Sequence, residues 1–271
     1  MRSSANSSAN KLALITGASE GIGYELAKQF AQNGYDLIIA AEDPGIVEAR
    51  QVFEALGVVV TSVQVNLAHA KGVEFFYEKV RGYGRPVDAA AINAGVGVGG
   101  DFTRETELQA ELNMINLNVS STVHLAKLVL KDMLQQGQGK VLFTSSVAAS
   151  MPSPFQAVYG ATKAFVHSFA EALRNELKGT QITITSLMPG ATDTNFFDRA
   201  GMQDTKIYTE EKDDPAEVAK EGFDALMAGK DHVVAGSFKN KVMTYGGKLL
   251  SDETKAAMHR RETEPGSAQP S

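Results

Sequence analysis

The chain has 271 residues, of which 43% are hydrophobic, so it can bury a sizeable core within one domain. Its formal net charge is -6 at pH 7 and its basic residues are scattered among acidic ones, which argues against nucleic-acid or membrane partners and favours small-molecule chemistry. It has no cysteine, which excludes disulfides, thiolate metal sites and cysteine nucleophiles and fits the reducing cytoplasm.

Both ends of the chain are expected to lie outside the folded domain. Residues 1–10 and 262–271 are small and polar with little to bury, so we expect two disordered tails around one domain at 11–261. The N-terminus lacks the apolar stretch of a secretion signal, and no segment approaches the roughly 18 apolar residues of a membrane span. A cytoplasmic location is therefore predicted.

Short apolar runs alternate with longer amphipathic stretches, which is typical of parallel strands joined by crossover helices. Strands are expected at 12–16, 36–40, 58–65, 87–93, 141–145, 182–188 and 232–234. Asp-Pro pairs at 43–44 and 214–215 each predict a helix start, the second before a helix at 216–227. The pattern predicts an α/β domain with a parallel sheet of about seven strands, helices on both faces, and ligands at the carboxyl ends of the strands.

The first strand leads into a glycine-rich turn, Thr16-Gly17-Ala18-Ser19-Glu20-Gly21-Ile22-Gly23, and then into an amphipathic helix. Its three glycines let the chain turn sharply and let a diphosphate approach the amides at the helix N-terminus. The spacing G-x-x-x-G-x-G differs from the commoner dinucleotide pattern and lacks the lysine of an ATP-binding loop. A plain tight turn, or the adenosine site of a methyltransferase, is the alternative to a dinucleotide site.

This turn, placed after a first strand, resembles the short-chain dehydrogenase/reductase family, whose Rossmann-like, doubly wound sheet binds NAD or NADP. The resemblance extends over about residues 11–236 and includes the sequence Asn93-Ala94-Gly95 after the fourth strand. Asn66 stands where family members usually carry an acidic residue beside the adenine, and its carbonyl still accepts from an amino group. Up to the fourth strand, the resemblance implies cofactor contacts at Gly17, Ser19, Glu20, Gly21, Ile22, Gly23, Glu42, Asn66, Leu67, Asn93, Ala94 and Gly95.

Oxidation of an alcohol requires a group that moves a proton at the hydroxyl. Tyr159 and Lys163 are four residues apart and therefore share one helix face, so the lysine is expected to lower the phenol pKa from its usual value near 10. The same spacing occurs in two other pairs, Tyr24 with Lys28 and Tyr208 with Lys212. The first is interpreted as packing and a solvated charge beneath the glycine turn, and the second as surface.

Two polar residues complete the set that the resemblance implies. Ser146 precedes Tyr159 by thirteen residues, as in the family, and would donate to the substrate oxygen, whereas Ser145 is interpreted as a strand-end serine bonded to backbone. Asn118 matches the family's helix asparagine, which holds a water in a proton relay to the lysine; the alternative is a polar helix residue without a role. The implied catalytic residues are Asn118, Ser146, Tyr159 and Lys163, and the implied activity interconverts an alcohol and a ketone or aldehyde.

The sixth strand ends in Pro189-Gly190-Ala191-Thr192-Asp193-Thr194, which resembles the family's turn beside the nicotinamide. This adds cofactor contacts at Pro189, Gly190, Thr192 and Thr194, besides Tyr159 and Lys163. In the family, NADP users carry basic residues in the glycine turn and after the second strand. Here these places hold Glu20 and Glu42-Asp43, which would repel a 2′-phosphate, so NAD is favoured over NADP unless Arg50 or Lys71 folds over a phosphate.

An alcohol or carbonyl substrate of moderate hydrophobicity is expected, because the loops around the site are rich in apolar residues. These are Val96, Val98, Phe102, Met151, Phe155, Phe196, Phe197 and Met202. His124 and His167 are interpreted as structural, and no metal is expected. Helices expected at 239–250 and 252–261 would add to an interface or cover the pocket, and the family resemblance implies a homodimer or homotetramer.

Three rival functions are considered beside the dehydrogenase. A dehydratase or epimerase would use the same scaffold, but the short C-terminal region argues against it. A dinucleotide-sensing protein without activity would not need the complete set of four polar residues. A methyltransferase would need the glycine turn but neither Tyr159 nor Lys163.

Overall fold

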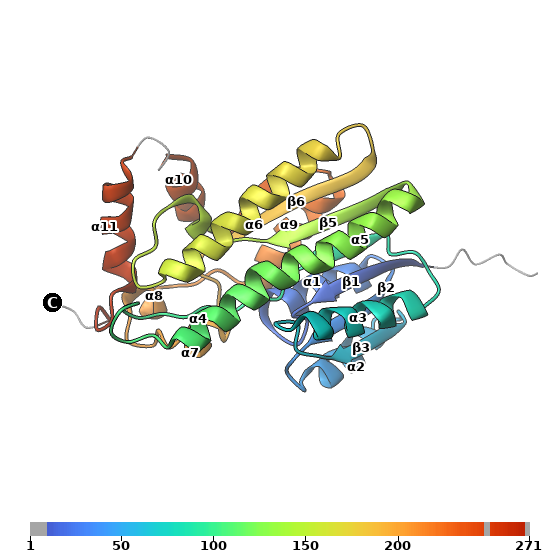
Figure 1. Ribbon diagram of the computed structural model, residues 1–271, viewed down its shortest axis with the longest axis horizontal. Coiled ribbons are helices and arrows are strands. Elements are labelled where there is room, and N and C mark those ends of the chain that lie inside the picture. The colour runs from blue at the N-terminus through green and yellow to red at the C-terminus, as the bar shows by residue number, and fades with distance from the viewer. Residues whose placement is uncertain (1–9, 247–249, 269–271) are drawn as a thin grey trace, which may run out of the picture.

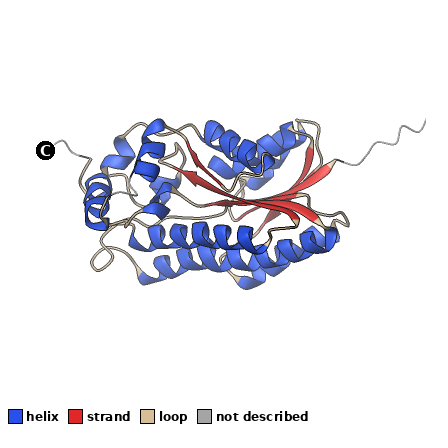
Figure 2. Cartoon of the chain, turned by 90° about the horizontal axis from the view of Figure 1, so that it is seen from above, coloured by secondary structure: helices blue, strands red, loops and turns tan. Residues whose placement is uncertain are grey.

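The computed structural model describes residues 10–246 and 250–268, which form a single parallel sheet between two layers of helices (Figures 1 and 2). The seven strands lie in the order β3-β2-β1-β4-β5-β6-β7. They are β1 (Lys11–Thr16), β2 (Tyr35–Ala41), β3 (Val60–Gln64), β4 (Ala89–Ile92), β5 (Gln138–Thr144), β6 (Gln181–Pro189) and β7 (His232–Ala235). The predicted doubly wound α/β fold is confirmed, with strand ends that differ from the predicted ones by a few residues.

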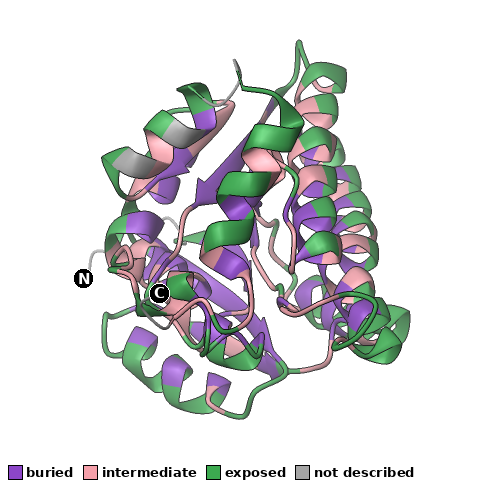
Figure 3. Ribbon diagram, turned by 90° about the vertical axis from the view of Figure 1, so that its left-hand side faces the viewer, coloured by how far each residue is buried: buried purple, intermediate pink, exposed green. Residues whose placement is uncertain are grey.

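The helices cover both faces of the sheet because successive side chains of each strand point to opposite sides. Ala13 and Ile15 pack against one helix layer, and Leu12 and Leu14 pack against the other. The first layer consists of α1 (Gly21–Gln32), α2 (Ile46–Glu54) and α9 (Pro215–Met227), and the second of α3 (Ala70–Gly82), α5 (Thr122–Gln136) and α6 (Ala157–Glu176). The strands are consequently buried, while the outer sides of the helices are exposed (Figure 3).

Of the two Asp-Pro pairs, one starts a helix and the other forms a turn before a helix. Asp214 caps α9 as predicted, since its carboxylate accepts from the Ala216 amide at 2.8 Å and Pro215 opens the helix. The prediction at 43–44 is wrong by two residues, because α2 begins only at Ile46. There the Asp43 carboxylate accepts from the Gly45 amide at 2.7 Å, which makes a tight turn before the helix.

One long helical stretch changes its pitch in the middle. α4 (Leu108–Ile115) continues through a π-helical turn, η1 (Asn116–Ser121), into α5. The Ser121 hydroxyl donates to the Leu117 carbonyl at 2.9 Å, and the Thr122 hydroxyl donates to the Asn118 carbonyl at 2.8 Å. Such turns are rare and occur frequently at functional sites.

The C-terminal helices α10 (Phe238–Gly246) and α11 (Asp252–Thr263) lie at one end of the molecule, where α11 packs against α8 (Lys206–Thr209) (Figure 1). The domain end expected at 261 is too early. Thr263 is buried and donates to the Pro154 carbonyl at 2.9 Å, and the Ala268 amide donates to the Asp204 carbonyl at 2.9 Å. The parts of the expected tails at 1–9 and 269–271, and the end of the helix expected at 239–250, lie outside the described residues.

None of the helices in the described part of the chain combines the length and hydrophobicity needed to cross a membrane.

Candidate active site

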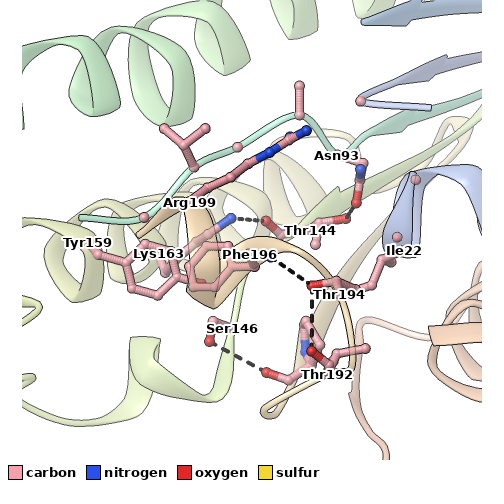
Figure 4. Close-up of a pocket in the computed structure, with 18 of the residues that line it drawn as sticks. Ile22, Asn93, Thr144, Ser146, Tyr159, Lys163, Thr192, Thr194, Phe196 and Arg199 are labelled. Atoms are coloured by element: carbon pink, nitrogen blue, oxygen red, sulfur yellow. Dashed lines mark hydrogen bonds between the residues drawn. The ribbon is translucent and has the colours of Figure 1, made fainter. Parts of the chain in front are cut away.

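A cavity of about 630 Å³ lies at the carboxyl ends of the strands (Figure 4). It is lined by the glycine turn, by the loops after β2 to β6, by α6 and by residues from α7 (Phe196–Arg199), α8 and α11. Every residue that the sequence analysis assigned to the cofactor lines this cavity, as do Ser146, Tyr159 and Lys163. Asn118 is the one member of the predicted catalytic set that does not.

The glycine turn forms one end of the cavity. Gly17 and Gly21 have positive φ values of 69° and 58°, which side chains other than glycine adopt only with strain. A Cβ on Gly23 would lie 2.0 Å from the Gly17 carbonyl oxygen, so this glycine allows α1 to approach the turn. No side chain caps the N-terminus of α1. Gly21, Ile22 and Gly23 of its first turn line the cavity at the positive end of the helix dipole, where an anionic diphosphate fits.

Hydrogen bonds tie the ends of β1, β4 and β5 together beneath the cavity. The Asn93 side chain donates to the Thr16 carbonyl at 3.1 Å and accepts from the Thr144 hydroxyl at 2.9 Å. The Thr16 hydroxyl accepts from the amides of Asn93 and Ala94, both at 3.0 Å. Thr16 and Thr144 position the loop after β4, a role that the sequence analysis did not give them.

Tyr159 and Lys163 are buried at the other end of the cavity, on α6. The Lys163 ammonium lies 5.7 Å from the centre of the Tyr159 ring and donates to the Thr144 carbonyl at 2.9 Å. Burial raises the pKa of Tyr159 to about 12, although a hydrogen bond with Ser146 acts in the opposite direction. Burial also lowers the pKa of Lys163 to about 8. Burial therefore acts against the acidic phenol expected from the sequence, and a lowering of this pKa by Lys163 stays a prediction.

The two neighbouring serines have different partners. The Ser146 hydroxyl accepts from the Ala148 amide at 3.2 Å, donates to the Pro189 carbonyl at 3.4 Å and lines the cavity (Figure 4). The Ser145 hydroxyl donates to the Lys163 carbonyl at 2.8 Å, which is the backbone bond expected of a strand-end serine. Ser146 is consequently the hydroxyl beside Tyr159.

Asn118 lies in the π-helical turn, and its side chain has several protein partners. Its oxygen accepts from the Val96 amide at 3.0 Å, and its nitrogen donates to the Val96 carbonyl at 2.9 Å and to the Thr162 hydroxyl at 3.1 Å. A Cβ on Gly95 would lie 3.1 Å from the Asn118 oxygen and 3.3 Å from the Lys163 ammonium nitrogen. Asn118 thus fixes the loop after β4 beside Lys163, and its part in a proton relay stays a prediction.

Helix α7 covers the tyrosine. The Phe196 ring lies 5.2 Å from the Tyr159 ring, centre to centre, and packs in a small apolar cluster with Val96 and Val98. Phe197, Ala200 and Met202 form a second buried cluster that anchors the segment. Of the apolar residues expected around the substrate, those that line the cavity are Val96, Met151, Phe196 and Phe197, whereas Val98, Phe102, Phe155 and Met202 do not line it.

Three charged or titratable residues in the cavity wall were missed. Arg199, at the end of α7, forms ion pairs with Glu20 at 2.7 Å and with Asp43 at 3.6 Å. His259 and Glu262 reach the cavity from α11. Arg199 follows the Pro189–Thr194 turn by five residues, and His259 and Glu262 lie near the C-terminus, but no local pattern marks any of the three as part of the site.

The residues weighed as alternatives for phosphate binding and for the Tyr-Lys pair have other positions and partners. Arg50 and Lys71, considered for a phosphate, do not line the cavity. Tyr24 packs on Phe53 with ring centres 4.9 Å apart, as interpreted, and the Tyr208 hydroxyl donates to Asp198 at 3.0 Å.

A separate group of possible metal ligands, Glu171, Asp231 and His232, has ligand atoms within 4.8 Å of one another. Arg174 pairs with both carboxylates, at 3.1 and 3.7 Å, and its positive charge disfavours a cation there.

Comparisons with known proteins give the family and the fold of the chain. A family model described as short chain dehydrogenase matches residues 11–204. The NADP-dependent 3-hydroxy acid dehydrogenase YdfG of Salmonella typhimurium is 29% identical over 179 residues, which are 66% of this chain and 71% of the relative. A short-chain dehydrogenase from Sphingobium yanoikuyae, solved with NADPH, has a TM-score of 0.76 at 25% identity and covers 96% of this chain and 98% of its own. A Burkholderia phymatum enzyme solved with NAD has a TM-score of 0.78 at 22% identity, over 94% and 97% of the chains, and shares the fold.

Proposed function

Because the chain belongs to the short-chain dehydrogenase/reductase family of oxidoreductases, we propose that it interconverts an alcohol and a ketone or aldehyde with NAD(P), and that Tyr159 transfers the proton. The observation that carries this proposal is the joint burial of Tyr159, Ser146 and Lys163 at one end of a cavity whose other end is an uncapped helix N-terminus.

The cavity fits an elongated dinucleotide. The amides of the glycine turn would hold its diphosphate, and Glu42, whose carboxylate accepts from the Asn66 side chain at 2.7 Å, would meet the adenosine ribose. When bound, the nicotinamide supplies or accepts the hydride. The acidic residues Glu20 and Glu42 favour NAD over NADP, which is part of this proposal.

The residues around Tyr159 suit the reduction of a carbonyl group. The protonated phenol is a proton donor to an oxygen on which charge develops. The Ser146 hydroxyl, whose bond to the Pro189 carbonyl is long at 3.4 Å, would turn from that carbonyl to donate a hydrogen bond to the same oxygen. Lys163, with a pKa of about 8, is mostly cationic at neutral pH and stabilises the phenolate left after proton transfer. The apolar walls formed by Val96, Met151 and Phe196 exclude water and favour a moderately hydrophobic substrate.

The proposal is tested by screening ketones and alcohols with NAD(H) and NADP(H) and by comparing the protein with its Tyr159→Phe variant. Removing the phenol hydroxyl should lower kcat by roughly 10²–10⁴-fold, the usual contribution of a positioned acid or base. Cofactor binding should change little, because the ring remains. A variant that reduces a good substrate as fast as the unaltered protein would exclude Tyr159 as the proton donor. The oligomeric state and the cytoplasmic location stay predictions.

A further inference from the structure

Arg199, at the end of α7, lies at the end of the cavity where the adenosine of the cofactor is proposed to bind. The two terminal nitrogens of the Arg199 guanidinium contact different segments: one lies 2.7 Å from Glu20 in the glycine turn, and the other lies 3.6 Å from Asp43 after β2. Glu20 also accepts from the Asn195 side chain at 2.8 Å. Arg199 lines the cavity with these acidic residues and is seen among its side chains in Figure 4.

The charges along the cavity are unevenly distributed. Among the described residues of its lining, the only lysine or arginine side chains are Lys163 and Arg199. Lys163 is buried beside Tyr159 and bonded to the Thr144 carbonyl, so it is committed to the catalytic end. At the other end, Glu20, Glu42 and Asp43 carry three negative charges, and Arg199 is the basic residue that offsets them.

We propose that Arg199 is a cofactor-specificity residue that offsets Glu20 and Asp43 and gives the 2′-phosphate of NADP a cationic partner. The inference rests on the proposed use of NAD(P) and concerns only the adenosine end of the site. With Arg199 in place, the acidic residues discriminate weakly against NADP, and without it they discriminate strongly. We therefore expect the protein to accept both NAD and NADP.

The guanidinium is free to exchange its partners. Its ion pairs are half-exposed, with 49% of the Arg199 side chain, 34% of Glu20 and 45% of Asp43 accessible, and such pairs contribute only about 0–1 kcal/mol. A phosphate carries more charge than one carboxylate and matches the planar guanidinium fork. The segment does not depend on Arg199 for its position, since Phe197, Ala200 and Met202 anchor it by burial. A variant at position 199 should therefore keep the fold.

The test is the ratio of the dissociation constants for NADPH and NADH, measured by the fluorescence of the reduced nicotinamide, which the tryptophan-free chain does not obscure. The two cofactors differ only at the 2′-phosphate, so any general effect on α7 cancels in the ratio. Arg199→Gln should raise the ratio by about tenfold or more, as expected for the loss of a charge-assisted contact. Glu20→Gln should lower the ratio, because it removes a repelling carboxylate.

Arg50→Gln is the matched control, because Arg50 pairs with Glu54 at 2.8 Å on α2 and does not line the cavity. It should leave the ratio unchanged. A ratio that Arg199→Gln changes by less than about twofold overturns the inference while the proposed function stands. If the unaltered protein binds neither reduced cofactor, the proposed function fails and this inference fails with it.

Discussion

Ser145 and Ser146, two adjacent serines after β5, are expected to have different roles in this site. Both serines line the cavity, but the Ser145 hydroxyl is bonded to the Lys163 carbonyl on α6, whereas the Ser146 hydroxyl lies beside Tyr159. A hydroxyl that donates to a substrate oxygen stabilises the charge that develops there during reaction. The Ser145 hydroxyl instead holds α6 near the end of β5 through its short bond to the Lys163 carbonyl.

Ser146→Ala should therefore lower kcat for carbonyl reduction by roughly 10²–10³-fold, the usual cost of losing one donor to a developing oxyanion. Ser145→Ala should reduce stability by about 1 kcal/mol, the net worth of one hydrogen bond, and change kcat little. Steady-state kinetics and denaturant unfolding of both variants distinguish these outcomes. Equal losses of kcat in the two variants would contradict the assignment of Ser146.

The residues of the site differ in how far the sequence revealed them. Helix geometry predicts that Tyr159 and Lys163 share one face, and their place after the buried strand that ends in serines singled them out from the two other pairs with the same spacing. The burial that raises the pKa of Tyr159 comes from tertiary neighbours such as Phe196 on α7, which the local sequence does not show. Arg199 was missed for a similar reason, since its carboxylate partners are more than 150 residues earlier in the chain.

At the level of elements, buried parallel strands were predictable because both of their faces are apolar and their sequences are continuous hydrophobic runs. β2, for example, is buried along its whole length. The π-helical turn at Asn116–Ser121 has no signal in the local sequence, and Asn118 within it bonds to Val96 and Thr162, which come from other parts of the chain. The start of α2 was misplaced because Asp43 bonds the Gly45 amide before the helix begins.

The cap of α9 offers a test at this level. The Asp214 carboxylate accepts from the Ala216 amide at the start of a helix that packs against α1 and covers β5 and β6. Asp214→Ala should lower the free energy of unfolding by about 1 kcal/mol, the typical cost of a lost N-cap. Asp214→Asn keeps an accepting oxygen and should cost much less. Urea unfolding measures both, and equal midpoints for the two variants would mean that the carboxylate does not act as a cap.

At the scale of the whole molecule, the C-terminal segment closes one wall of the cavity. Two hydrogen bonds join it to the start of α8. The Lys206 amide donates to the Ser267 hydroxyl at 2.9 Å, and the Gly266 amide donates to the Asp204 carboxylate at 2.8 Å. α11 also supplies His259 to the cavity wall. The sequence left open whether this region covers the pocket or adds to an interface, because α11 is a polar helix without a marked apolar face.

His259 makes the stability of this closure depend on pH. Its imidazole is buried, which lowers its pKa from 6.5 to about 4, against the effect of a hydrogen bond to the Pro154 carbonyl. In the unfolded chain, His259 is protonated below pH 6.5, whereas in the folded protein it is protonated only below about pH 4. The free energy of unfolding therefore falls as the pH decreases through this window, and His259 contributes at most about 3 kcal/mol of that loss.

The variant His259→Asn cannot be protonated and should lose less stability between pH 7 and pH 4 than the unaltered protein, by up to about 3 kcal/mol. Urea unfolding at several pH values gives the difference in the free energy of unfolding between the two proteins. The titration of the carboxylates is common to both and cancels in this difference. His124→Gln, on the partly exposed side of α5, is the control and should follow the unaltered protein. Parallel curves for the unaltered protein and His259→Asn would contradict the lowered pKa of His259 and its contribution to the pH dependence of stability.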